Sequence, residues 1–318
     1  MILERLEPGA AVVVVRLRSM GDTVLTTPAL ALLKTARPDL RLYVVLESVW
    51  KRLLEGNPDI SGMIEAGPAR APVVAEIRRL RPSLCLNLHG GATSAWLTAF
   101  SGARWRAGFG HFRRGWLYNV QIPRAQDILG RLPDAPVHTA EHLASAMFYL
   151  GIPRAEIPRA RLYAEPARRP RPYAVIHTGA AYATKQWPAE RFTDVAAWLR
   201  DQQGLEPVVI RGPEDCSLAE MMYLLAGAEL FVGNDSGPAH VAAAFGVPAV
   251  VIFGSSNSRV WHPWRTPYQL VETAWDCKPC PGDRCYAFDQ PRCILSVEAD
   301  PVRRAVSSLL GARTVLGA

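Results

Sequence analysis

The chain has 318 residues, of which 49% are hydrophobic and 20% charged, and a formal net charge of +7. These proportions are typical of a folded globular protein and exclude wholesale disorder and fibrous repeats. No apolar run approaches the roughly 18 to 20 residues that span a membrane, and the N-terminus lacks the pattern of a signal peptide. We therefore expect a cytoplasmic protein, whose positive charge permits an anionic substrate, a membrane surface or nucleic acid.

The first half of the chain alternates strand patterns with helical patterns. The β-branched run at 11–15 predicts a buried strand and is followed by an alanine- and leucine-rich helix ending near 38–40. A strand at 41–48, a helix at 73–82 and a strand at 83–91 follow. This order predicts a doubly wound parallel sheet.

The proline- and arginine-rich stretch 152–172 interrupts this pattern and is typical of a linker. The pattern then restarts with predicted strands at 173–177, 206–212, 229–237 and 247–254, and with a last helix closed by Gly311. We therefore predict two Rossmann-like, doubly wound α/β domains facing a cleft, at 1–160 and 173–318.

The segment RLRSMGDT (16–23) leaves the first predicted strand and enters a helix. Ligands of open α/β sheets bind at such carboxyl ends of strands. Gly21 permits a tight turn, and Asp22 stands at the helix start. A carboxylate there is either a helix cap or a general base that takes a proton from a hydroxyl group. A dinucleotide-binding GxGxxG motif is absent.

The segment NDSGPAH (234–240) has the same strand-to-helix position in the second half. Backbone N–H groups exposed by the small Ser236 and Gly237 form a natural phosphate site at a helix start. Asp235 would repel a phosphate, so we expect it to order the loop or to bind a neighbouring hydroxyl. His240 either donates to a phosphate or a sugar, or is a structural histidine.

A third strand-to-helix loop, HTGAAYATKQWP, spans 177–188. Lys185 in this loop is a compact point charge that can pair with a diphosphate, and the alternative is an ordinary surface lysine. Trp187 and Pro188 are expected to anchor the helix start.

Four of the six cysteines, Cys277, Cys280, Cys285 and Cys293, follow the spacing C-x2-C-x4-C-x7-C. Four thiolates can hold a tetrahedral structural zinc or an iron, and the alternative is four free thiols in a proline-rich loop. A closed four-sulfur site would be structural, because it leaves no open position for catalysis.

Arginines alternate with aromatic residues in 104–116, where Arg104, Arg106 and Arg113 stand out. Such a patch can bind single-stranded nucleic acid, an anionic acceptor or membrane headgroups. It can also be a solvated face whose arginine stems cover apolar surface. No recognised nucleic-acid motif accompanies the patch, so we expect no nucleic-acid partner.

Taken together, these segments resemble the glycosyltransferase family 9 heptosyltransferases, which transfer heptose from ADP-heptose to lipopolysaccharide core. The resemblance rests on 16–30, 101–109, 185–192, 234–254 and the cysteine segment 277–293. It implies a GT-B fold, with an anionic glycolipid acceptor on the N-terminal domain and the nucleotide-sugar on the C-terminal domain. It also implies a cytoplasmic enzyme that is peripheral at the inner face of the inner membrane.

The resemblance assigns roles residue by residue. Asp22 matches the family's proposed catalytic base, and Lys185 matches a lysine that contacts the donor phosphates. The remaining donor-binding positions are Thr178, Gly179, Asp235, Ser236, Gly237 and His240. The implied reaction is an inverting displacement without a catalytic metal, and some relatives hold a metal with cysteines like these four.

The chain departs from the family pattern at 212–228, where only 17 residues connect two predicted strands. Family members usually have an additional strand and helix there. Two alternatives therefore remain beside heptose transfer: a related transferase that uses another nucleotide-sugar, and a degenerate GT-B module that binds glycan or acts as a scaffold.

Overall fold

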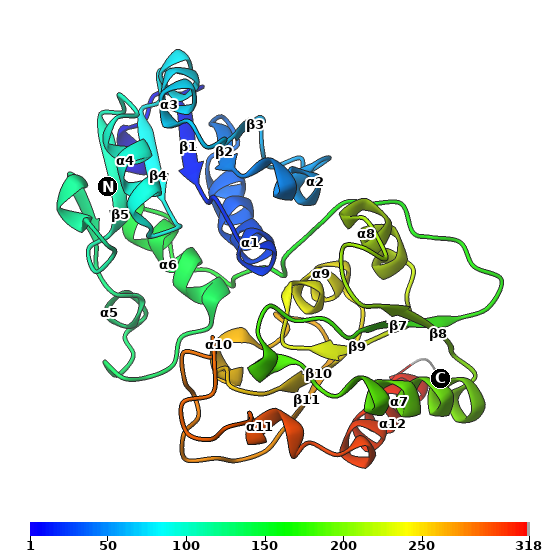
Figure 1. The fold of residues 1–318 in the computed structure, drawn as a ribbon. Helices are drawn as coiled ribbons and strands as arrows, with labels where there is room; N and C mark the ends of the chain where they lie inside the picture. The colour runs from blue at the N-terminus through cyan, green and yellow to red at the C-terminus, as the bar shows by residue number, and fades with distance from the viewer. Residues whose placement is uncertain (317–318) are drawn as a thin grey trace. The chain divides into compact units, whose positions relative to one another are not determined.

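The computed structural model describes the backbone of residues 1–316 and the side chains of residues 1–312 (Figure 1). Its contacts divide the chain into two compact units, Met1–Tyr163 and Ala164–Ala318. The boundary falls within the proline- and arginine-rich stretch, and residues 152–172 contain no helix or strand. Both units are α/β, as the sequence predicts.

The first unit is built on a six-stranded parallel sheet in the order β3-β2-β1-β4-β5-β6. Its strands are β1 (Ala11–Val15), β2 (Arg41–Leu46), β3 (Gly62–Glu65), β4 (Leu84–Asn87), β5 (Trp105–Phe109) and β6 (Val120–Ile122). Its helices are α1 (Met20–Ala36), α2 (Lys51–Leu54), α3 (Arg70–Arg79), α4 (Ala92–Ala99), α5 (Ala125–Leu129) and α6 (Thr139–Leu150).

The burial of the strands in the first unit agrees with their order in the sheet. Every residue of β1 is buried, as expected for a β-branched strand at the centre of a parallel sheet. Val13 and Val15 pack with Ile77 of α3 and Leu97 of α4. The helix α6 begins at a cap in which the His138 ring accepts a hydrogen bond from the Ala140 N–H over 3.1 Å.

The second unit is built on a five-stranded parallel sheet in the order β11-β10-β9-β7-β8. Its strands are β7 (Tyr173–His177), β8 (Glu206–Ile210), β9 (Leu230–Asn234), β10 (Ala249–Phe253) and β11 (Tyr268–Glu272). Its helices are α7 (Ala189–Gln203), α8 (Leu218–Ala226), α9 (Gly237–Phe245), α10 (Ser258–Trp261), α11 (Arg292–Leu295) and α12 (Ala299–Leu316).

Aromatic and β-branched side chains hold the second unit together. Trp187 and Phe192 meet edge to face with ring centroids 4.8 Å apart, and the Trp187 indole donates a 2.7 Å hydrogen bond to the Val297 carbonyl. These contacts fix the start of α7 on the sheet, as the sequence predicts for Trp187.

Three features differ from the sequence-based expectations. The strands β3, β5, β6 and β11 were not predicted, because they are short or only partly buried. The short connection at 212–228 contains the helix α8, which begins at a capping box formed by Ser217 and Glu220. The last helix was predicted to end at Gly311, but α12 continues through this glycine. Within the described residues, no helix is both long and apolar enough to cross a bilayer.

Candidate functional site

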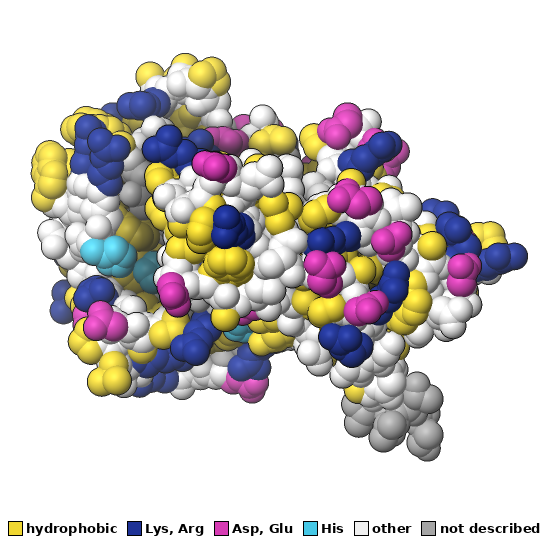
Figure 2. Space-filling model, turned by 60° about the horizontal axis from the view of Figure 1, so that its bottom comes forward, with side chains coloured by type: hydrophobic (Ala, Val, Ile, Leu, Met, Phe, Trp, Pro, Cys, Tyr) yellow, Lys and Arg dark blue, Asp and Glu magenta, His cyan; other side chains and the backbone are white. Residues whose placement is uncertain are grey.

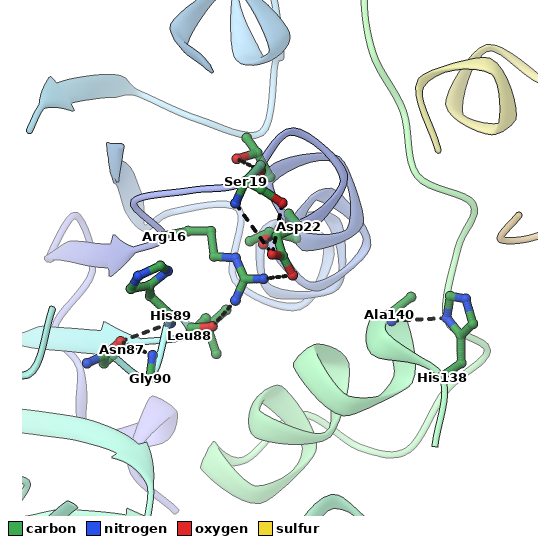
Figure 3. A network of polar contacts seen from close by, with 11 residues as sticks. Arg16, Ser19, Asp22, Asn87, Leu88, His89, Gly90, His138 and Ala140 are labelled. Atoms are coloured by element: carbon green, nitrogen blue, oxygen red, sulfur yellow. Dashed lines mark hydrogen bonds and ion pairs between the residues drawn. The ribbon is translucent and has the colours of Figure 1, made fainter. Parts of the chain in front are cut away.

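In the first unit, Asp22 lies at the turn where β1 runs into α1. Its carboxylate forms an ion pair with the Arg16 guanidinium, which also donates a hydrogen bond to the Leu88 carbonyl (Figure 3). The other carboxylate oxygen accepts from Ser19 Oγ over 3.1 Å and from the Ser19 N–H over 3.4 Å. Three groups from the segment that follows β1 therefore fix the orientation of this carboxylate.

Asp22 caps the helix α1 and is still open to a further hydrogen-bond donor. The residue completes a capping box with Ser19, so the helix-cap prediction describes a real contact. Its side chain is nevertheless 24% exposed, whereas the Arg16 side chain is 7% exposed. A carboxylate has about four lone-pair sites, so an incoming hydroxyl group can still donate to Asp22.

The end of β4 supplies a second polar group beside Asp22. The Asn87 side-chain oxygen accepts from the backbone N–H groups of His89 and Gly90, over 2.9 and 3.1 Å. Its amide donates to Ser94 and to the Tyr118 hydroxyl. Burial and the neighbouring Arg16 lower the pKa of His89, which is neutral at pH 7.

Two further histidines gather beside β5. The His142 ring stacks on Phe109 with centroids 4.1 Å apart, and the His111 ring lies 5.8 Å from His142. Burial, then the charges of His111 and Arg16, lower the pKa of His142 to about 4. His89, His111 and His142 were not predicted from the sequence as site residues, although His89 and His111 each lie two residues after the end of a strand.

The three predicted acceptor arginines do not lie together. Arg104 and Arg106 are at the amino end of β5, where Arg104 covers its neighbour Trp105 and Arg106 donates to the Ala103 carbonyl. Asp22 follows the carboxyl end of β1, the opposite edge of the parallel sheet. Of the three, Arg113 alone lies in the loop after β5, and the assignment of the three to the acceptor stays a prediction.

In the second unit, Lys185 and Asp235 form an ion pair. The Lys185 ammonium donates to the Asp235 carboxylate over 2.8 Å. Asp235 is 5% exposed and Lys185 24% exposed, so the lysine is the solvent-facing member. Asp235 thus orders the loop, which is one of its two predicted roles. The ion pair also holds the Lys185 ammonium beside the start of α9.

Asn234 joins the two predicted donor loops. Its side-chain oxygen accepts from the Trp187 N–H over 3.0 Å, and its amide donates to the Thr178 carbonyl over 2.8 Å. Gly179 packs so closely that a Cβ atom there would overlap the Arg211 carbonyl oxygen. Asn234 is the first residue of the segment NDSGPAH, but this connecting role was not predicted from the sequence.

The start of α9 has the features of an anion site. Ser236 is its N-cap residue, and Gly237 and Pro238 form its first turn, a position where helix geometry leaves the first backbone N–H groups without partners inside the helix. His177, whose pKa is lowered to about 4 by burial, lies 3.5 Å from Ser236 Oγ. His240 is buried, one turn into the helix, with its ring 6.2 Å from that of Trp261.

The four clustered cysteines line one small cavity of about 150 Å³, together with Thr184 and Ser255. Within the described residues, however, no three His, Cys, Asp or Glu side chains are grouped as metal ligands. Burial raises the pKa of the Cys293 thiol. The zinc or iron site therefore stays a prediction, and no step of the transfer reaction depends on it.

The cysteine segment does support the lysine loop. The Thr184 hydroxyl donates to the Gly282 carbonyl, and the Cys280 N–H donates to the Ser255 carbonyl over 3.1 Å. Together with the Ser255 N–H, which donates to the Thr184 carbonyl over 3.3 Å, these contacts join the short helix Ala183–Lys185 to the cysteine segment.

Comparison with known proteins agrees with this arrangement. The family model described as glycosyltransferase family 9 (heptosyltransferase) matches residues 73–217 and 215–287. The chain belongs to glycosyltransferase family 9. It is therefore a glycosyltransferase, and the two matched segments meet at the short connection before α8.

The family has relatives of known sequence and structure that span most of the chain. Lipopolysaccharide heptosyltransferase 3 of Escherichia coli is 26% identical over 305 residues, which cover 78% of this chain and 84% of the relative. The structure of E. coli ADP-heptose lps heptosyltransferase II has a TM-score of 0.77 and 18% identity, and covers 96% of this chain and 99% of that one. The GT-B prediction is confirmed by this likeness.

An iron-containing dodecameric glycosyltransferase of enterotoxigenic E. coli has the same fold. It aligns with a TM-score of 0.63 and 18% identity over 96% of this chain and 77% of that one. At this identity the likeness shows the fold alone.

Proposed function

We propose that this protein transfers heptose from ADP-heptose to a lipopolysaccharide core or related glycan acceptor, with inversion at the anomeric carbon. The observation that carries the proposal is the geometry of Asp22. It is a partly exposed carboxylate at the carboxyl end of a central strand, oriented by Arg16 and Ser19. The relatives, a lipopolysaccharide heptosyltransferase 3 and an ADP-heptose lps heptosyltransferase II, suggest the sugar and the acceptor class.

Asp22 acts as the general base in the proposed reaction. It takes the proton of an acceptor hydroxyl group while the hydroxyl oxygen attacks the anomeric carbon of heptose. The bond between that carbon and the diphosphate oxygen breaks on the opposite face, and ADP leaves with the electron pair. Proton transfer to a positioned base accelerates such reactions by about 10² to 10⁴-fold.

The second unit binds the donor and stabilises the leaving group. Lys185 places its positive charge on the diphosphate, and the N–H groups at the start of α9, near Ser236 and Gly237, donate to the phosphate oxygens. Thr178 and Gly179 line the same loop, and His240 donates to the donor from the first turn of α9. In this scheme protein groups supply the charge stabilisation, so the proposed step requires no divalent metal.

The first unit binds an anionic glycolipid acceptor. Arg113 in the loop after β5 supplies positive charge, while neutral His89 and His111 offer hydrogen bonds to sugar hydroxyl groups. We place the enzyme in the cytoplasm, peripheral at the inner face of the inner membrane, because its acceptor is attached to a lipid.

The test compares wild type with Asp22→Asn, an isosteric variant that cannot accept the proton. With ADP-heptose and an isolated core acceptor, kcat should fall about 10² to 10⁴-fold, while calorimetry should give an unchanged Kd for ADP. Equal turnover by the two proteins would overturn the role of Asp22. A panel of UDP-, GDP- and ADP-sugars checks the donor, and turnover with another nucleotide-sugar but not with ADP-heptose would replace the substrate while keeping the mechanism.

A further inference from the structure

A groove of about 1050 Å³ lies between α3 and α4 on the first unit. Apolar side chains, among them Val74 and Leu97, form part of its lining. Its charged lining residues are Arg70, Arg78, Arg79 and Arg81, so every charge in the groove is positive. The lining of this α3–α4 groove does not include Asp22 or any residue of the donor loops.

Two aromatic rings lie along one wall of the α3–α4 groove. Trp96 and Phe100 stack with their centroids 5.4 Å apart and their planes inclined by 13°. Phe100, the C-cap residue of α4, is 49% exposed. The Arg78 guanidinium donates to the Phe100 carbonyl over 2.8 Å and so lies beside the exposed ring.

The basic and aromatic character continues toward the carboxyl edge of the sheet. The Arg114 guanidinium lies 5.1 Å from the Trp96 ring centroid, within the range of a cation–π interaction. The next turn, Gly115–Leu117, packs on α4 and presents Trp116, which is 72% exposed. A surface of arginines and exposed aromatic rings thus runs from the groove to the loop that follows β5.

The charge of this surface is uncompensated. The only acidic residue of α3, Glu76, is not among the lining residues of the groove. Among the described residues, no carboxylate forms an ion pair with any of the four groove arginines. Figure 2 shows one face of the molecule, on which Lys and Arg lie among Asp and Glu over much of the surface.

We propose that the α3–α4 groove, with Phe100 and Trp116, is the surface that docks this protein on an anionic phospholipid bilayer. Exposed aromatic rings settle at the boundary between headgroups and acyl chains, while arginines pair with anionic headgroups. The apolar lining and the single sign of charge fit a bilayer better than they fit a soluble anion. The inference deepens the proposed function, since it rests on an acceptor that is attached to a lipid.

Vesicle binding tests the proposal. The full chain is sedimented with phosphatidylcholine vesicles that contain or lack phosphatidylglycerol. We expect binding to the anionic vesicles alone, and a fall in the partition coefficient of about 5-fold per arginine removed, hence roughly 25-fold for Arg70→Gln/Arg79→Gln. The variant Phe100→Ser should also reduce binding.

Matched controls separate a docking surface from general charge. Arg168→Gln/Arg171→Gln removes the same charge from exposed positions of the second unit, and Tyr149→Ser removes an exposed aromatic ring from α6; both should bind as wild type does. The proposal would be overturned if the wild-type protein did not bind anionic vesicles. It would also be overturned if the groove variants bound them as well as the controls do. Binding that glycerol phosphate abolishes would instead indicate a soluble phosphate ligand and would also overturn it.

The activity assay keeps this proposal separate from the proposed function. With an acceptor freed of its lipid chains, the groove variants should keep wild-type kcat, and they should lose turnover only with acceptor embedded in vesicles. A protein that binds anionic vesicles but transfers no heptose would leave the docking surface intact and contradict the proposed function.

Discussion

Arg16 and Asp22 face each other across the turn between β1 and α1, and the guanidinium that orients the carboxylate is almost fully buried. Burial lowers the pKa of Arg16, and the Asp22 charge opposes that shift. The arginine also donates to the Leu88 carbonyl at the end of β4. One side chain therefore links two neighbouring strand ends to the proposed base.

Replacing Arg16 by methionine should impair both stability and catalysis. Losing one partner of a buried ion pair costs about 3 to 5 kcal/mol, and because Asp22 is partly exposed we expect the lower end, about 3 kcal/mol, in urea unfolding. A carboxylate misplaced by about 1 Å should reduce kcat roughly 10²-fold. Arg16→Lys keeps the charge and should recover part of kcat. A variant that loses stability but keeps wild-type kcat would show that Arg16 is structural only.

Variants of Lys185 and Asp235 distinguish the effect of Lys185 on donor binding from the effect of the ion pair on stability. Lys185→Ala should weaken ADP binding about 10-fold or more, because a charge-assisted contact to phosphate is worth about 1.5 to 3 kcal/mol. It also leaves the buried Asp235 carboxylate without its cation, so the melting temperature should fall. Adding Asp235→Asn should restore much of the melting temperature without restoring ADP affinity. Recovery of both in the double variant would contradict a direct contact between Lys185 and the donor.

The sequence predicted the two strand-to-helix junctions because their chemistry is local. A buried β-branched run followed by a glycine turn and a polar residue places Asp22 at a sheet edge whatever the rest of the chain does. The same holds for Asp235 and Ser236 after β9. The short strands β3, β5, β6 and β11 were missed because partial burial leaves only a weak alternation of apolar and polar residues.

Contacts that depend on the packing of distant segments could not be read from the sequence. Arg104 and Arg106 looked like part of a basic patch, but they form the amino end of β5, and the strand direction takes them away from Asp22. His142 reaches Phe109 and His111 because α6, which packs on α1 and α5, brings it to the end of β5. Asn234 holds two loops that lie 47 and 56 residues away along the chain.

His142 should make stability depend on pH. Its pKa falls from 6.5 to about 4 on folding, so the unfolded chain binds a proton that the folded protein does not bind between these values. The stability contribution is complete above pH 6.5 and is lost as the pH falls toward 4, at a slope of up to about 1.4 kcal/mol per pH unit. His142→Phe keeps the stack on Phe109 and should flatten this slope in urea titrations from pH 7 to pH 4. An unchanged slope would assign the dependence to other groups, of which His177 is the first to examine.

Gly254 should control the position of Lys185. It follows β10, and a Cβ atom there would overlap the Thr184 carbonyl oxygen and lie 3.1 Å from the Ile294 side chain. Gly254→Ala therefore has to push the short helix Ala183–Lys185 away from the sheet. Overpacking of this kind costs about 1 to 3 kcal/mol, so we expect a lower melting temperature.

The displacement in Gly254→Ala should also weaken ADP binding, because Lys185 directly follows Thr184 in that helix. The matched control is Gly67→Ala, since a Cβ atom at Gly67 has no atom within 4 Å. Calorimetric titration with ADP checks the expectation, and Gly67→Ala should bind as wild type does. If Gly254→Ala lost stability but kept wild-type affinity for ADP, the position of this helix would not govern the donor site, and the assignment of Lys185 to the diphosphate would lose its structural support.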